Sequence, residues 1–85
     1  PDGTFLFWLQ EEYPDESKWN EITEIFCFNK QLTSLKGIGN LPNLTRLHCN
    51  RNQLTTLKGI EKLSNLSYLN CFSNQLTTLK EIKYL

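Results

Sequence analysis

The sequence is short of the residues that most catalytic sites need. It has one histidine, His48, and two aspartates, Asp2 and Asp15, which both lie near the N-terminus. Its four glycines form no phosphate-binding loop, and no strained serine elbow occurs. No set of nucleophile, base and orienting group can be assembled from these residues. We therefore expect a protein that is not an enzyme and that needs no cofactor.

Long apolar runs and an excess of one charge are also missing. No stretch approaches the roughly 18 consecutive apolar residues of a membrane span. Nine basic residues balance nine acidic ones, so the net charge indicates neither nucleic acid nor a membrane as partner. The two signs are separated, however, because residues 1–25 hold seven acidic side chains and one basic one, and residues 26–85 hold eight basic and two acidic. This asymmetry predicts either a dipole that steers a charged partner or simply two solvated faces.

The chain does contain a repeat of 22 residues. The pattern L-x-x-L-x-C-x-x-N-x-L occupies residues 44–54 and returns at residues 66–76. A weaker copy begins near Trp19 and places Ile22, Ile25 and Cys27 in phase with the others. A fixed period of this length indicates a solenoid. We expect the repeats to span residues 19–85, with units at 22–43, 44–65 and 66–85, the last one incomplete.

These three copies resemble the leucine-rich repeat family, in the short 22-residue variant of bacterial internalin-like proteins. The resemblance implies an α/β fold: a right-handed solenoid with short parallel strands on its concave face and 3₁₀ turns on its convex face. It also implies protein–protein recognition. The first copy departs from the family's pattern, because Lys30 stands where the later copies have Asn52 and Asn74. Lysine cannot accept a hydrogen bond, so we expect Asn29 or a water to substitute, or a looser turn.

The N-terminal residues 1–18 are expected to form a helical cap over the first repeat. Asp2 or Thr4 can cap a helix over residues 2–13, and Pro14 ends it. The spacing of the apolar residues puts one face of this helix on the core: Phe5, Trp8, Leu9 and Tyr13. Residues 15–21 are predicted to be a loop that holds Trp19 at a core position of the repeat.

A glycine also recurs with the repeat. Gly37 and Gly59 occupy a turn position where positive φ is easily adopted, and Glu81 replaces them in the third copy, so that turn either tolerates a side chain or has another shape.

The three cysteines, Cys27, Cys49 and Cys71, are expected to be a column of small buried thiols. A metal site shared with His48 is disfavoured, because neighbours on a strand point to opposite faces, and a disulfide is disfavoured because parallel side chains do not converge. Free thiols weakly favour a reducing compartment such as the cytoplasm, with a secreted or surface location as the alternative.

The candidate functional site is the concave face. Its residues alternate with the core positions and differ between the units, and they include four aromatic side chains of a kind enriched in binding sites. We predict that a protein partner binds there, through Glu24, Phe26, Phe28, Arg46, His48, Asn50, Arg51, Tyr68, Asn70 and Phe72. The alternatives are that Phe26 and Phe28 pack beneath the cap and that Phe72 shields a strand edge.

The function then has three possible forms. The protein is a binding module, or a small inhibitor that occludes its target, or a structural capping fragment of a longer repeat array. The sequence stops at Leu85 without a polar cap, so we expect either more repeats or self-association through the exposed end. Self-association of this kind would bury Leu76, Leu79, Ile82, Tyr84 and Leu85.

Overall fold

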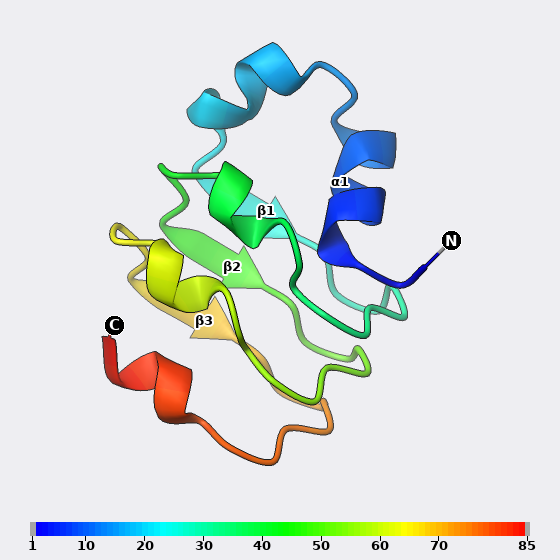
Figure 1. The fold of residues 1–85 in the computed structure, drawn as a ribbon, viewed down its shortest axis with the longest axis vertical. Helices are drawn as coiled ribbons and strands as arrows, with labels where there is room; N and C mark the ends of the chain where they lie inside the picture. Colours follow the sequence, from blue (N-terminus) through cyan, green and yellow to red (C-terminus); the bar gives the residue numbers. More distant parts are fainter. Residues whose placement is uncertain (1, 85) are drawn as a thin grey trace.

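The computed structural model describes the backbone of residues 2–84 and the side chains of residues 2–82. One α-helix and a short 3₁₀ helix precede three units, each made of a strand, a turn and a 3₁₀ helix (Figure 1). None of the described helices is long and apolar enough to cross a membrane. In chain order the elements are α1 (Phe5–Glu12), η1 (Glu16–Glu21), β1 (Glu24–Phe26), η2 (Ile38–Asn40), β2 (Arg46–His48), η3 (Ile60–Lys62), β3 (Tyr68–Asn70) and η4 (Lys80–Tyr84).

The strands form an open parallel sheet in the order β1-β2-β3. Every pairing joins residues that are 22 apart in the chain, as in the row Ile25, Leu47 and Leu69. The 3₁₀ helices η2, η3 and η4 stack in the same order as the strands (Figure 1). The period in the sequence therefore becomes a spatial register, which confirms the predicted repeat.

The core lies between the sheet and the stacked 3₁₀ helices. It is built from the recurring apolar positions, which are buried in the first two units and become partly exposed in the third. Cys27 and Cys49 lie in this core as free thiols, and Cys71 is half-buried. The predicted column of small core thiols is thus present.

Because these thiols are buried, we expect the free energy of unfolding to fall as the pH becomes alkaline. Burial raises the pKa of Cys27 far above its usual value of 9.0 and that of Cys49 to about 12, because a buried thiolate loses its hydration. The folded chain therefore keeps two protons that the unfolded chain loses as the pH rises past 9. We expect the free energy of unfolding to fall by about 1–2 kcal/mol between roughly pH 8 and roughly pH 9.5.

Urea titrations at a series of pH values measure this decline. The double variant Cys27→Ala/Cys49→Ala, although less stable overall, should lose distinctly less stability over the same range. An equal decline in both proteins would mean that other groups cause it.

The asparagine side chains join each unit to the one before it. The Asn52 amide donates to the carbonyls of Cys27 and Cys49 at 3.0 Å, and its Oδ1 accepts from the backbone N–H groups of Lys30 at 2.9 Å and Leu32 at 3.0 Å. Asn52 is only 7% exposed, so these bonds satisfy backbone groups that water reaches poorly.

Asn29 does not replace the missing asparagine of the first unit, and the first turn is not left without side-chain bonds. Asn52 serves the first turn from the next unit, 22 residues away. An asparagine at position 30 would reach back toward a preceding strand, and among the described residues 2–84 no strand precedes β1 in the sheet. The exposed Lys30 therefore costs the fold little.

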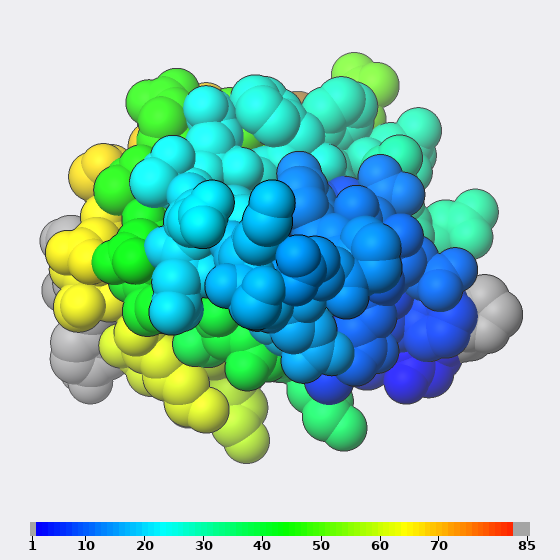
Figure 2. Space-filling model, turned by 90° about the horizontal axis from the view of Figure 1, so that it is seen from above, coloured from blue at the N-terminus to red at the C-terminus, as the bar shows by residue number. Residues whose placement is uncertain are grey.

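The N-terminal segment packs against the first unit. Thr4 caps α1 by accepting from the Phe7 N–H, as predicted, and Phe5 and Leu9 are buried in the common core. The backbone joins the first turn directly, because the Phe5 N–H donates to the Ser34 carbonyl at 3.0 Å and the Leu6 N–H to that of Lys36 at 2.8 Å. Figure 2 shows the blue and cyan N-terminal residues spread over this end of the molecule.

Two details of that segment differ from the sequence-based expectation. Tyr13 is exposed instead of packing on the core, although its ring makes an edge contact with Trp8. Residues 15–21 are not a loop, because Asp15 caps the 3₁₀ helix η1 by accepting from the Ser17 N–H at 3.1 Å. The Trp19 indole donates to the Tyr13 carbonyl at 2.8 Å, which fixes Trp19 in the core as predicted.

The turn glycines behave as expected, and the third unit differs. Gly37 and Gly59 have φ of 94° and 112°. Glu81 does not adopt positive φ and lies inside η4, so the last turn has another shape. The Glu81 side chain is buried, and its Oε2 accepts from the Thr56 hydroxyl at 3.4 Å. The exchange of glycine for glutamate is therefore accommodated by starting the 3₁₀ helix earlier.

Candidate functional site

The outer face of the sheet carries the residues that the sequence singles out. We call this surface the sheet face: Glu24, Phe26, Phe28, Arg46, His48, Asn50, Tyr68, Asn70 and Phe72. The strand register aligns its rows, with Glu24 beside Arg46 and Tyr68, and Phe26 beside His48 and Asn70. These residues alternate with core residues such as Ile25, Leu47 and Cys49, so all nine side chains stay at least partly accessible.

Five of these side chains, Glu24, Phe26, Arg46, His48 and Tyr68, contact one another, and we call them the sheet-face cluster. The Glu24 carboxylate accepts from Arg46 Nε at 3.1 Å and lies 2.7 Å from His48 Nε2. The His48 ring stacks on Phe26 with a centroid separation of 4.3 Å and contacts Tyr68 on its other side at 5.1 Å. The Arg46 guanidinium lies 4.2 Å above the Tyr68 ring. His48 thus contacts three other residues of the sheet face. The side chain of its neighbour Cys49 is buried in the core.

The charges of the sheet-face cluster are paired with one another. The hydrogen bonds from His48 and from Arg46 lower the pKa of Glu24 below its usual value, so the carboxylate is ionised at neutral pH. Arg46 holds this negative charge on one side and the electron-rich face of Tyr68 on the other. The cluster therefore presents aromatic edges and a pre-oriented guanidinium rather than freely rotating charges.

The ends of the strands form a second and more open part of the surface. Phe28 is 45% exposed and Phe72 is 77% exposed. Arg51 belongs to the unit between theirs, is exposed, and has a backbone φ of 59°. The Arg51 N–H donates to the Phe72 carbonyl at 2.8 Å, which places these two residues side by side. Asn70 accepts from the Phe72 N–H and so steadies the turn.

The structure decides between the alternatives for the aromatic residues. Phe26 is 53% exposed, and neither it nor Phe28 packs beneath the N-terminal segment. Lys30 was not among the predicted site residues, yet it is exposed and immediately follows the turn of Phe28. Its departure from the asparagine pattern is the signal that could have identified it.

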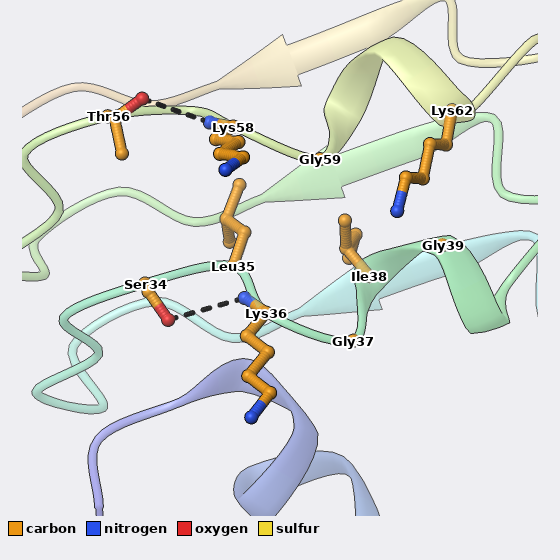
Figure 3. Close-up of a pocket in the computed structure, with 10 residues that line it drawn as sticks. All are labelled: Ser34, Leu35, Lys36, Gly37, Ile38, Gly39, Thr56, Lys58, Gly59 and Lys62. Carbon is orange, nitrogen blue, oxygen red and sulfur yellow. Dashed lines mark hydrogen bonds between the residues drawn. The ribbon is translucent and has the colours of Figure 1, made fainter.

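A hollow on the opposite side of the molecule has a different composition. It has a volume of about 300 Å³ and lies between the turns that precede η2 and η3 (Figure 3). The Lys58 and Lys62 side chains extend toward its middle, and Lys36 extends toward α1 (Figure 3). Its floor residues Leu35 and Ile38 are almost fully buried.

The end of the molecule beside β3 exposes apolar side chains. Leu79 is 51% exposed, Ile82 is also exposed, and Leu76 and Cys71 are half-buried. The side chain of Tyr84 and the whole of Leu85, which the sequence-based prediction also includes, lie outside the described residues.

Two comparisons with known proteins bear on this arrangement. A family model described as leucine-rich repeats in two copies matches residues 20–62 and again residues 42–84. The two matches together span three quarters of the chain and follow the same units as the strand register. No curated protein matches the chain at a significant level.

Proposed function

The chain belongs to the leucine-rich repeat family, whose repeats generally serve as protein-interaction modules, and we propose that it is a binding protein that recognises a protein partner through its sheet face. In the right-handed solenoid that we propose for the repeats, this is the concave face. The residues that make contact are those of the sheet face together with Arg51.

The observation that carries the proposal is the accessible aromatic surface. Phe26, Phe28 and Phe72 are each at least 45% exposed, and Tyr68 lies among them under Arg46. Leaving such rings in water is unfavourable, whereas burying them against a partner contributes strongly to binding. The stacking on His48 already holds Phe26 in one orientation, which lowers the entropy cost of binding.

The N-terminal residues have a structural role in this proposal. Residues 1–18 act as the cap of the solenoid, since Phe5 and Leu9 complete the core of the first unit. The cap leaves the sheet face open, and this separation allows surface variants to be made without disturbing the core.

A quantitative co-purification experiment tests the proposal. Immobilised wild-type protein is compared with Phe72→Ala, Arg46→Glu and, on the opposite side, Lys58→Glu. We expect a specific partner that Lys58→Glu retains and that the two sheet-face variants bind about tenfold or more weakly. Phe72→Ala removes the exposed ring that a partner would bury, and Arg46→Glu reverses a charge on the same face. Circular dichroism establishes that each variant is folded. The proposal fails if Phe72→Ala and Arg46→Glu bind the same partners as the wild type with the same affinity.

A further inference from the structure

We infer that the partner contributes an acidic polypeptide segment, whose carboxylates bind Arg51 and Lys30 while its apolar side chains cover Phe28 and Phe72. We call these four residues the basic rim. The inference rests on the proposed function and specifies the chemistry of the partner.

Charge is the first argument for an acidic partner. Glu24 is the one acidic residue of the sheet face, and its carboxylate is already bound to Arg46 and His48. Arg51 and Lys30 are exposed and make no ion pair with any described residue. The charge left for a partner on this surface is therefore positive, in a part of the chain, residues 26–85, with eight basic and two acidic side chains.

The arrangement of the basic rim is the second argument. The backbone bond from Arg51 to Phe72 and the bond from Asn29 to Asn50 hold the strand-end turns of the three units against one another. Phe28 and Lys30 consequently lie on the turn of the first unit, Arg51 on the adjoining turn of the second and Phe72 on that of the third. A guanidinium binds a carboxylate through two parallel hydrogen bonds, and the flanking rings reduce the access of water to that contact.

The backbone at Arg51 is the third argument. Its φ of 59° lies in the left-handed region, which the fold also imposes on the matching residues Asn29 and Ser73. Glycine or asparagine meets that requirement with the least strain, and arginine has no advantage in it. Because its side chain is exposed and unpaired among the described residues, recognition is the function that accounts for an arginine at this position.

A nucleic acid is the other class of partner that combines with basic and aromatic side chains. It is disfavoured here, because the chain has no net charge and the rim offers only two free cations. The experiment below includes it as an outcome that would overturn the inference.

The probes are three fluorescent ligands measured by anisotropy. The first is a peptide in which glutamates alternate with leucine and phenylalanine, the second has glutamine for every glutamate, and the third is a single-stranded oligothymidine. We expect the acidic peptide to bind about tenfold or more tightly than the glutamine peptide and to weaken as salt is raised. We also expect it to bind more tightly than the oligothymidine.

Matched variants locate the contact. Arg51→Gly should weaken the acidic peptide about tenfold while its urea midpoint stays equal to or above that of the wild type, because glycine relieves the left-handed backbone. Ser73→Gly makes the same backbone change without removing a charge, and Lys58→Gln removes a charge on the opposite side. Both controls should bind the acidic peptide like the wild type.

The outcomes separate this inference from the proposed function. Equal binding of the acidic and glutamine peptides, with both weakened by Phe72→Ala, overturns the charge inference and leaves recognition by the sheet face standing. Tighter binding of the oligothymidine overturns it in favour of a nucleic acid, and equal losses for Lys58→Gln and Arg51→Gly overturn it in favour of diffuse attraction. If a partner or peptide binds and Phe72→Ala, Arg46→Glu and Arg51→Gly all leave it unaffected, the proposed function fails as well.

Discussion

Replacing Asn52 with alanine should lower the free energy of unfolding by about 3 kcal/mol or more, because it leaves three backbone groups of the first unit without partners. The variant loses the bonds to the Cys27 carbonyl and to the N–H groups of Lys30 and Leu32. The Cys49 carbonyl also loses its bond from Asn52 but keeps the one from the Asn74 amide at 3.0 Å. Each buried group left unpaired costs about 1–3 kcal/mol. In a domain of this size such a loss lowers the melting temperature by at least about 12 °C.

Asn74 is the matched control for Asn52. It occupies the same position one unit later, is half-buried, and its Oδ1 accepts from Leu54 alone. We expect Asn74→Ala to cost only about 1–2 kcal/mol, since water can reach more of the groups that it leaves. Urea denaturation of both variants gives the comparison, provided that the slopes agree. A cost for Asn74→Ala as large as that for Asn52→Ala would contradict the role assigned to burial.

Replacing Gly37 with alanine should cost about 2–4 kcal/mol and loosen the attachment of α1. The new Cβ would lie 2.6 Å from Leu6 Cβ and 3.1 Å from Leu6 Cα, in a residue whose φ is 94°. The left-handed backbone contributes about 1–2 kcal/mol, and displacement of the helix contributes the remainder. The Leu6 N–H to Lys36 carbonyl bond lies at the same contact and is expected to lengthen or break.

Two other glycines isolate these contributions. Gly59→Ala has the same backbone strain, with φ of 112°, but meets only the Ile38 methyl group at 3.0 Å and should cost about 1–2 kcal/mol. Gly39→Ala meets the flexible Lys62 side chain without positive φ and should change stability by less than about 0.5 kcal/mol. Urea midpoints and tryptophan fluorescence, to which Trp8 on α1 and Trp19 both contribute, report on all three variants. Equal costs at Gly37 and Gly59 would show that α1 moves aside freely.

The regular part of the fold can be predicted from sequence because every unit repeats the same geometry. The 22-residue spacing of Ile25, Leu47 and Leu69 becomes the strand register directly, and the spacing of Gly37 and Gly59 marks the same left-handed turn twice. The N-terminal helix is also predictable, since Thr4 and Pro14 mark its limits. These features depend on local pattern and need no knowledge of side-chain conformation.

The unpredicted features depend on single side chains that act across units. The 3₁₀ helix η1 is held by the Asp15 cap and by the bond from the Trp19 indole to the Tyr13 carbonyl. Neither contact recurs with the repeat, so the periodicity of the sequence does not predict them. The sequence places Glu24, Arg46 and His48 in neighbouring rows, but only their rotamers decide that one carboxylate oxygen binds both. Arg46 and His48, which the sequence predicts to bind a partner, are for that reason already bound to other side chains of the sheet face.

The backward reach of Asn52 has a consequence for the order of folding. The amides of Lys30 and Leu32 in the first turn obtain their acceptor from a residue that is synthesised some twenty positions later. At ribosomal rates of about 5–20 residues per second, the first turn stays open to water for about a second or more after it has emerged. The backbone bonds of a turn are thus completed only when the next unit has been synthesised. A nascent chain halted before Asn52 should keep rapid hydrogen exchange at the amides of Lys30 and Leu32.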